Sequence, residues 1–440
     1  MPTTFRPYQP DQMLLMPPKL RDWVPPSHLA HHVSDVVDAM DISVLYERYE
    51  GDGRRAKPYS PWMMLKVLIY GYATGVFSSR GIARKLEEDV AFRMLGAGNF
   101  PDHRTICTFR RRNLEHLRGL FLQVVRLSRE MGLSRFGTLS IDGTKVRANA
   151  SKRKAMSYER MVREEARLEE EIEGLTATAE QVDEEEDRRF GEEVRGDELP
   201  AELRRREDRL AAIRAAKERL EAAQREADDA RGREPGQDRS AKNGREYARA
   251  YGEPEAKAQS NFTDPESGIM KTSTEGFQQC YNAQTVVDDA NQMVVDASVS
   301  ACASDQGELI SRLDAVEEEF DTQPEAVLAD AGYCNEADLV ALEARGIDGY
   351  VAVGREGKKQ VAVDPKTRPA TARMKKKLDT AAGRVRYARR KWLSEAPNGW
   401  IKEVLGFRRF SFRGLAKVQA EWHLVCLALN IKRIATLKAA

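Results

Sequence analysis

Residues 137–145 read Gly-Thr-Leu-Ser-Ile-Asp-Gly-Thr-Lys, and this stretch predicts a β-strand. Leu139 and Ile141 alternate with small polar residues, which is the period-two pattern of a strand with one buried face. Asp142-Gly143 is a turn signal that ends or bends the strand, so we expect the Asp142 carboxylate at the rim of a sheet. Taken alone, an aspartate at such a position is more simply a local cap.

A second apolar strand carries an acid in the same way. Residues 326–333 read Ala-Val-Leu-Ala-Asp-Ala-Gly-Tyr and place Asp330 directly after the strand. Glu395 lies farther on, on an expected helix within a strongly basic segment. Hard cations such as Mg²⁺ prefer carboxylate oxygens, and a pair of them clamps the attacking and leaving oxygens of a phosphoryl transfer. Three carboxylates from separate elements therefore predict a divalent-metal site that acts on phosphates.

The composition indicates a globular chain with a polyanionic partner. The chain has 440 residues, 41% of them hydrophobic, which predicts more than one domain. Its net charge of +1 conceals strong segregation, because residues 51–130 and 351–440 are basic whereas residues 151–350 are acidic. Basic regions on both sides of an acidic middle favour a partner such as nucleic acid.

The five cysteines are scattered without a Cys-x-x-Cys pair, so neither a zinc site nor a disulfide framework is indicated. This usage is typical of a reducing cytosol. No apolar run reaches membrane-spanning length, and the N-terminus lacks the apolar segment of a signal peptide. We therefore expect a cytoplasmic protein without a membrane partner.

Residues 1–27 are proline-rich and predict an irregular arm, which a helical domain follows at residues 28–132. Ser27 is the expected N-cap of the first helix. Three clustered histidines lie there without a nearby thiol, which favours helix surface or local packing over a metal site. They are His28, His31 and His32.

Later helices of this domain are expected to begin at Ser60-Pro61, at Ser78 or Ser79, and after Asp102. In the last of them, Ile106 and Phe109 face inward and the arginines face outward. Short helices with a basic last member resemble helix-turn-helix packing on DNA. An all-α domain with merely solvated arginines fits the same pattern. The arginines are Arg104, Arg110, Arg111 and Arg112.

Residues 151–258 form an insertion rich in Glu, Arg and Ala. Apolar stripes at helical spacing over residues 161–175 and 199–220 predict a helical hairpin packed as an antiparallel coiled coil. A dimerisation or DNA-clamping arm and a plain solvated hairpin both fit this pattern. Residues 231–258 have little apolar content and predict a flexible linker.

The sheet resumes after the insertion, and strands alternate with helices in an order that predicts a mixed α/β sheet domain. Asp264 is a rival acid, but its Asp-Pro sequence is a turn outside any strand. The final helix places Trp422 and Val425 on one apolar face that should pack on the sheet. The expected elements are strands at 278–288, 292–300, 326–329 and 349–353 and helices at 306–320, 336–345 and 415–437.

Taken together, these motifs resemble bacterial insertion-sequence transposases of the DDE class, in the branch with a Tyr-Arg-Glu-Lys signature. The resemblance covers nearly the whole chain. It implies a ribonuclease H-like catalytic domain at residues 133–150 and 259–440. The matching motifs are the helical region 59–112 and the segments 140–144, 263–267, 328–333, 399–403 and 406–410.

Carried over by this resemblance, Asp142, Asp330 and Glu395 are the catalytic and metal-binding acids. Tyr387, Arg390 and Lys402 complete the signature and grip DNA phosphates. Four residues separate Arg390 from Glu395 where the stricter form has three, so Lys391 is an alternative for the arginine position. Glu403 is the substitute acid if Glu395 does not serve.

The resemblance further implies an enzyme that binds two Mg²⁺ ions, or Mn²⁺ in their place. Its partners would be double-stranded DNA, as terminal inverted repeats and target, and a second copy of the chain in a homodimer. It would work in the bacterial cytosol at the nucleoid. A ribonuclease H-like nuclease without strand transfer and a DNA-binding derivative without catalysis remain the alternatives.

Overall fold

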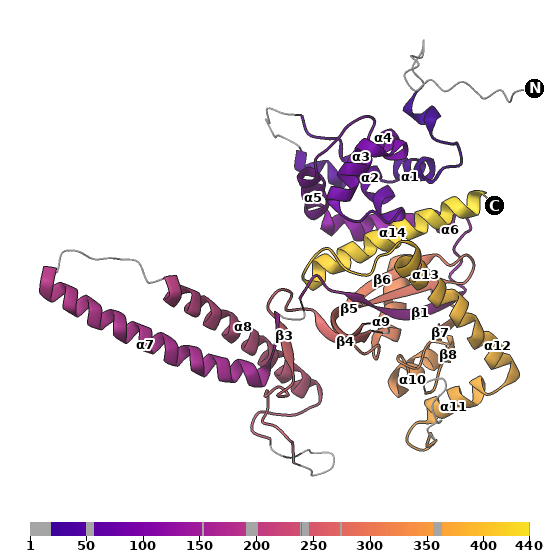
Figure 1. Ribbon diagram of the computed structural model, residues 1–440. Helices are drawn as coiled ribbons and strands as arrows, with labels where there is room; N and C mark the ends of the chain where they lie inside the picture. The colour runs from indigo at the N-terminus through magenta and orange to yellow at the C-terminus, as the bar shows by residue number, and fades with distance from the viewer. Residues whose placement is uncertain are drawn as a thin grey trace, which may run out of the picture.

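The computed structural model describes residues 19–49, 57–151, 154–190, 201–237, 239, 246–272, 275–354 and 363–439. Residues 1–18 of the predicted N-terminal arm lie outside the described residues. Over the described ranges the chain is a mixed α/β structure in which a twisted sheet lies beside a helical region, and a long helical hairpin projects away from both (Figure 1).

Within these ranges the main sheet has six strands, and β1 is central to it. β5 pairs antiparallel with β1, with β4 and with β6, while β1, β7 and β8 run parallel to one another. The strands predicted at 278–288 and 292–300 and the strand before Asp330 are confirmed as β5, β6 and β7. The strands are β1 (Thr138–Arg147), β4 (Gly268–Thr272), β5 (Gly276–Asp288), β6 (Val294–Ser300), β7 (Ala326–Ala329) and β8 (Asp348–Val351).

The turn predicted at Asp142-Gly143 is wrong, because β1 continues through it to Arg147. Asp142 pairs with Thr285 and Gly143 with Gln284, so backbone pairing with β5 holds this part of the chain extended. Glycine occupies position 143 for a different reason. A Cβ atom at Gly143 would lie 2.6 Å from Asp305 Oδ1, so glycine is needed for close packing rather than for a turn.

The helices expected to begin at Ser60-Pro61, at Ser78 and after Asp102 do so. Ser78 accepts a hydrogen bond from Gly81 N, and Asp102 accepts from Arg104 N and Thr105 N. The first helix is capped by His28 rather than Ser27, and His31 Nε2 lies 3.2 Å from Val24 O, so these histidines serve local packing. The helices are α1 (Leu29–Asp38), α2 (Pro61–Ala73), α3 (Ser79–Glu88), α4 (Val90–Leu95), α5 (His103–Arg112) and α6 (Leu117–Glu130), with short helical turns at Leu20–Trp23, Ser43–Leu45, Glu47–Tyr49 and Leu114–His116.

The insertion is a two-helix hairpin of α7 (Tyr158–Phe190) and α8 (Ala201–Ala230) on a small two-stranded base of β2 (Ala155–Ser157) and β3 (Gln259–Asn261). Buried apolar residues join the two helices, as the stripes predict, and ion pairs such as Arg214 with Glu165 flank them. The chain after α8 folds back on its end. Asp228 Oδ2 accepts from Gly252 N there, and the flexibility of residues 231–258 stays a prediction.

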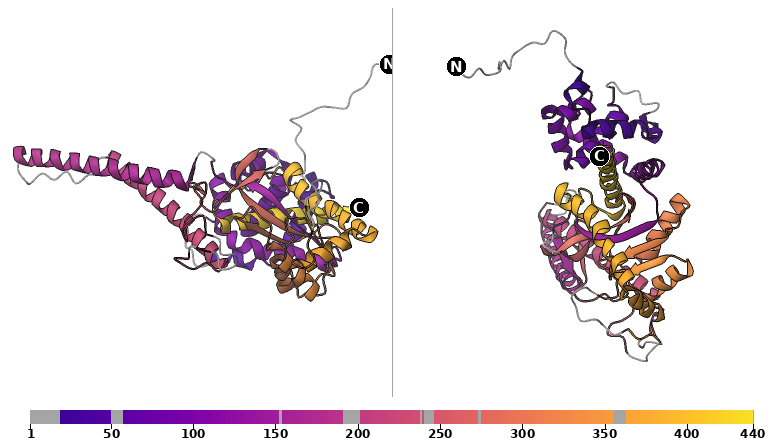
Figure 2. Two further views of the ribbon diagram at one scale, coloured as in Figure 1. Left: turned by 90° about the horizontal axis from the view of Figure 1, so that it is seen from below. Right: turned by 90° about the vertical axis from the view of Figure 1, so that its right-hand side faces the viewer.

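Helix α14 (Leu415–Ala439) lies between the sheet and the N-terminal helices (Figures 1 and 2). Trp422 is fully buried and donates from Nε1 to Gln284 O of β5. Leu424 and Ala428, on other faces of the helix, are fully buried too. The predicted packing of the Trp422 face on the sheet is therefore confirmed, and the helix is apolar on its other faces as well. The helix is covered on both sides, and one hydrophobic core extends from α1 to the sheet.

The remaining helices cover the sheet and carry the basic segment. The described part of the chain contains no helix long and apolar enough to cross a bilayer. These helices are α9 (Glu308–Phe320), α10 (Glu336–Ala344), α11 (Pro369–Leu378), α12 (Ala381–Arg390) and α13 (Ala396–Gly399), with π-helical turns η6 (Lys391–Glu395) and η7 (Trp400–Val404).

Acid should weaken this core through His423 of α14. Burial, helped by the nearby Arg118 and Arg312, lowers the pKa of His423 to about 4, against the backbone contact to Ala297 that favours the charged ring. Because the folded pKa lies below the unfolded value of about 6.5, the unfolded chain binds the extra proton. The stability that depends on a neutral His423 is intact above about pH 6.5. It is lost as the pH falls toward 4, and the free energy of unfolding decreases by up to about 3 kcal/mol.

We therefore expect the free energy of unfolding to fall across this window, as measured by urea titration at several pH values. In His423→Gln, which keeps a donor for Ala297 O, the pH dependence between 6.5 and 4 should be shallower. An identical slope in the two proteins would contradict the assignment.

Candidate active site

Asp142 and Asp330 lie at equivalent points on adjacent parallel strands. Ile141 of β1 is in register with Ala329 of β7, so the next residue of each strand is an aspartate. Burial, against the opposing charge of Arg390 and with the charge of Asp330 in support, raises the pKa of Asp142 to about 6. The two carboxylates therefore interact electrostatically, and Arg390 of the basic segment is the cation close to Asp142.

Backbone and side-chain donors hold both carboxylates. Asp142 Oδ1 accepts from Gly143 N at 3.0 Å, and Asp142 Oδ2 accepts from Asn398 Nδ2 at 3.2 Å. Asp330 Oδ1 accepts from Gly332 N at 2.7 Å. These contacts fix the orientation of the two side chains at one edge of the sheet.

The basic segment from Ala381 to Val404 is one continuous helix that crosses this edge, and it contains two π-helical turns. The π turn at Lys391–Glu395 places Glu395 beside Arg390, with Oε1 3.6 Å from Nη2. A π turn brings residues i and i+5 together, so it accommodates the extra residue between the two. The Glu395 side chain is 55% exposed and that of Arg390 is 11% exposed.

The other residues of the predicted signature lie on this helix or near it. Tyr387 packs against Leu328 and Tyr350, and its ring lies 5.7 Å from the Arg390 guanidinium. Lys391 is exposed. Glu403 forms an ion pair with Arg408 on the helix's outer side. Glu403 is therefore not placed beside Asp142 in this arrangement.

Two residues that sequence reasoning missed face the strands from the same helix. Ser394 is buried with its Oγ against Ser140 Oγ of β1, and Asn398 is the side chain that reaches Asp142. Arg390, Ser394 and Asn398 recur every four residues. Helical spacing counted forward from Arg390 would have singled them out.

A third missed residue is Asp305, in the loop after β6. Its Oδ1 accepts from Asn282 Nδ2 at 2.6 Å and from Gln284 Nε2 at 2.8 Å, and it lies 3.7 Å from Lys145 Nζ. Asp305 Oδ2 would lie 3.0 Å from a Cβ atom at Gly332. Asp305 therefore packs against the glycines that follow both Asp142 and Asp330, which explains why these positions lack side chains.

The donor set suits a hard cation, although no closed metal cluster is formed. Within the described ranges, no three Asp, Glu, His or Cys side chains come close enough to hold one ion together. Asp142 and Asp330 supply carboxylate oxygens, the ligand type that Mg²⁺ prefers. Asn398 Oδ1 is buried without a hydrogen-bond partner beside them. The residues present therefore fit a divalent cation held by oxygen ligands.

A basic groove of about 280 Å³ begins beside Asp142. It runs along β1 and β4 to the end of the long helix, and its cations outnumber its acids. Lys402 lies in it, and burial lowers the pKa of its ammonium while nearby Cys280 opposes that shift. Such a groove suits a phosphate backbone. It is lined by Gly143, Thr144, Lys145, Arg147, Lys271, Thr272, Glu275, Lys402, Glu403 and Arg408.

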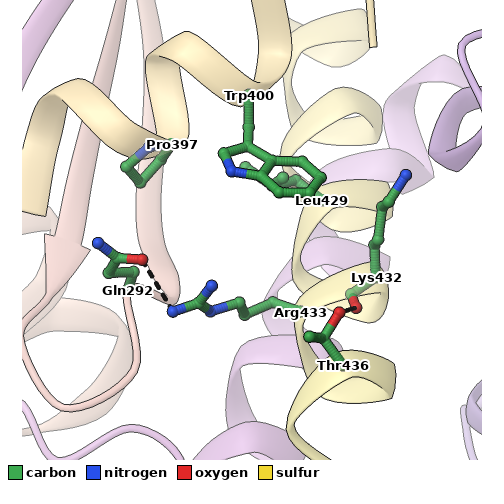
Figure 3. Close-up of a pocket in the computed structure, with 7 residues that line it drawn as sticks. All are labelled: Gln292, Pro397, Trp400, Leu429, Lys432, Arg433 and Thr436. Atoms are coloured by element: carbon green, nitrogen blue, oxygen red, sulfur yellow. Dashed lines mark hydrogen bonds between the residues drawn. The ribbon is translucent and has the colours of Figure 1, made fainter. Parts of the chain in front are cut away.

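A smaller pocket lies on another side of the long helix (Figure 3). Trp400 forms one wall and Lys432 lies 5.6 Å from its ring, while Arg433 of α14 donates to Gln292 Oε1. None of the predicted site residues lines this pocket. It is therefore separate from the carboxylates.

The predicted DNA-facing arginines of α5 divide into two groups. Arg110 is buried and donates to Tyr72 Oη and Phe77 O, so the expectation that it faces outward is wrong. It turns inward because α14 supplies Glu421 as a buried counter-ion. Arg111 is exposed, and Arg104 and Arg112 line a pocket of about 400 Å³ with Lys57 and Tyr59.

Aspartates on adjacent parallel strands, oxygen ligands and a basic groove define an arrangement suited to phosphoryl transfer on a nucleic acid. Comparison with known families agrees. Residues 18–112 match a family described as a transposase domain (DUF772), and residues 249–431 match one described as a transposase DDE domain. These two matches support an insertion-sequence DDE transposase, an enzyme that acts on DNA. No curated protein and no solved structure matches the chain.

Proposed function

We propose that this chain binds the terminal inverted repeats of its own insertion sequence and catalyses strand cleavage and strand transfer with divalent cations. The observation that carries the proposal is the position of Asp142, within β1, next to Asp330, directly after β7, beside a basic groove. The strand order β6-β5-β1-β7-β8, antiparallel and then parallel, is the order of a ribonuclease H-like sheet and supports that fold.

Asp142, Asp330 and Glu395 are the residues proposed to hold two Mg²⁺ ions, with Mn²⁺ as a substitute. When bound, such ions activate a water or a 3′-hydroxyl and stabilise the leaving oxygen. In this proposal the ion pair between Glu395 and Arg390 breaks. Glu395 then moves to the two aspartates, and Arg390 becomes available to bind a phosphate. Arg390 offers a bidentate fork, whereas Lys391 and Lys402 act as point charges.

DNA recognition is proposed for the exposed face of the N-terminal helices. Arg104, Arg111 and Arg112 lie on one short helix, and Lys57 adds a further cation next to them. Arg110 supports this face from inside. A homodimer in which two element ends are cut together follows from the same proposal, and the projecting hairpin is available as an arm for the partner or for DNA.

A reaction with end-bearing DNA tests the proposal. A linear DNA that carries both ends of the element is incubated with the chain, a supercoiled plasmid and Mg²⁺, and the products are separated by gel. Cleavage at the ends with joining to the plasmid is expected. Cleavage without joining would favour a nuclease, and binding without metal-dependent cleavage would favour a catalytically inactive DNA-binding protein.

Lys402→Ala should reduce the salt dependence of DNA binding. Each phosphate contact that a lysine makes releases counter-ions, so the slope of log affinity against log salt should become shallower by about 0.9. Fluorescence anisotropy between low and moderate salt measures this slope. Lys366, an exposed lysine outside the groove, is the control position as Lys366→Ala. Equal slopes for Lys402→Ala and wild type would exclude the contact.

A further inference from the structure

We propose that Asn398 is a ligand residue of the cation site, its side-chain carbonyl oxygen completing the set that Asp142 and Asp330 begin. This inference rests on the proposed function. It concerns a residue type that sequence reasoning did not consider, because the signature directs attention to the acids of the helix. Three observations carry it.

The first observation is position. Asn398 lies on the helix face that points at the strand ends, two helical turns after Arg390, and its side chain reaches Asp142 directly. Glu395 instead points to Arg390 and is more than half exposed. In this arrangement, Asn398 is the oxygen-bearing side chain that the helix brings to Asp142.

The second observation is that one of the two polar atoms of the Asn398 amide has a hydrogen-bond partner and the other has none. Asn398 is 7% exposed, Nδ2 donates to Asp142 Oδ2, and Oδ1 is buried without a partner. A buried carbonyl oxygen without a donor costs free energy, because it has lost its hydrogen bonds to water. A cation beside Asp142 would satisfy this oxygen. Amide carbonyls ligate hard divalent cations alongside carboxylates.

The third observation is that the helix holds this residue firmly. Pro397 and Ile401 are buried on either side of it, and Ser394 is locked against Ser140 one turn earlier. A side chain fixed in this way has little conformational entropy left to lose on binding an ion. The site is therefore already formed around the amide.

The test is Mn²⁺ binding to the full chain without DNA. Binding is measured by the electron paramagnetic resonance signal of free Mn²⁺ and by calorimetry. We expect Asn398→Ala to weaken Mn²⁺ binding about tenfold or more. Asn398→Asp should retain or strengthen it, because a carboxylate supplies the same ligand oxygen with added charge. Asn113→Ala, at an equally buried asparagine of the N-terminal region, should bind as the wild type does. Unfolding midpoints show whether each variant is folded.

The outcomes separate this inference from the proposed function. Unchanged Mn²⁺ affinity in Asn398→Ala, together with loss in Asp142→Asn and Asp330→Asn, would overturn the role of Asn398 alone. Weak binding in Asn398→Asp as well as in Asn398→Ala would also overturn it, since the amide would then only orient Asp142 as a donor. A wild-type chain that binds no Mn²⁺ would overturn both proposals.

Discussion

Asp142→Asn should abolish DNA cleavage, by at least about 10³-fold, while leaving the protein as thermally stable as the wild type. Removing a metal-binding carboxylate loses several kcal/mol of transition-state stabilisation, and each 1.36 kcal/mol is about a tenfold loss in rate. Stability is spared because the ionised carboxylate is disfavoured where it lies. Burial raises the pKa of Asp142, and Asp330 repels its charge. The Asn amide keeps an acceptor for Gly143 N.

Gel assays of end cleavage and scanning calorimetry measure the two effects. Asp330→Asn should lose cleavage to a similar extent. Asp314→Asn, at an exposed aspartate of α9 that pairs with Arg345, is the control and should cleave as the wild type does. Cleavage by Asp142→Asn at more than a tenth of the wild-type rate would show that Asp142 and Asp330 do not form the active site.

Glu421→Ala should destabilise the protein by about 3–5 kcal/mol, the usual result of removing one member of a buried charge pair. Glu421 is fully buried, accepts from Tyr72 Oη at 2.8 Å and from Ser411 N at 2.7 Å, and faces Arg110 at 4.0 Å. Its loss leaves the Arg110 guanidinium without its counter-ion in the core. This cluster joins α2, α5 and α14, so the helical region and the sheet should loosen together.

Urea unfolding measures the loss, and a double-mutant cycle tests its cause. Replacing both partners, as Arg110→Met with Glu421→Met, should recover part of the stability, because no buried charge then remains unpaired. The exposed pair Arg373 and Glu343 is the control, and Glu343→Ala should cost no more than about 1 kcal/mol. A loss below about 1 kcal/mol in Glu421→Ala would contradict a structural role for the cluster.

The strands and most helix boundaries could be predicted because local signals determine them. Leu139 and Ile141 alternate along β1, Ala326–Ala329 is a short apolar run, and Asp102 caps α5 through its own side chain. Each signal acts within a few residues of itself. For the same reason, the sequence associated Asp142 and Asp330 with apolar strands, although β1 continues past Asp142 and only the parallel register of β1 with β7 brings the two acids together.

Contacts between distant segments decided what the sequence misassigned. Arg110 fits a solvated stripe on α5, but α14 supplies Glu421 far along the chain and draws the guanidinium inward. Gly143 fits a turn, but pairing with β5 keeps it extended, and Asp305 occupies the space that a side chain there would need. No periodicity within a single segment carries this information, because the partner in each pair lies on another element.

The sequence by itself therefore determined the mixed α/β class, the association of Asp142 and Asp330 with apolar strands, and the basic character of the segment from Ala381 to Val404, since composition and short-range periodicity specify these properties. Only the tertiary structure decided which side chains of that segment face Asp142. The π turn at Lys391–Glu395 sets the rotation of the helix after Arg390, bringing Glu395 to Arg390 and Asn398 to Asp142. The physical reason is that a π turn inserts one residue into the helical repeat, and packing against the sheet determines where that insertion is tolerated.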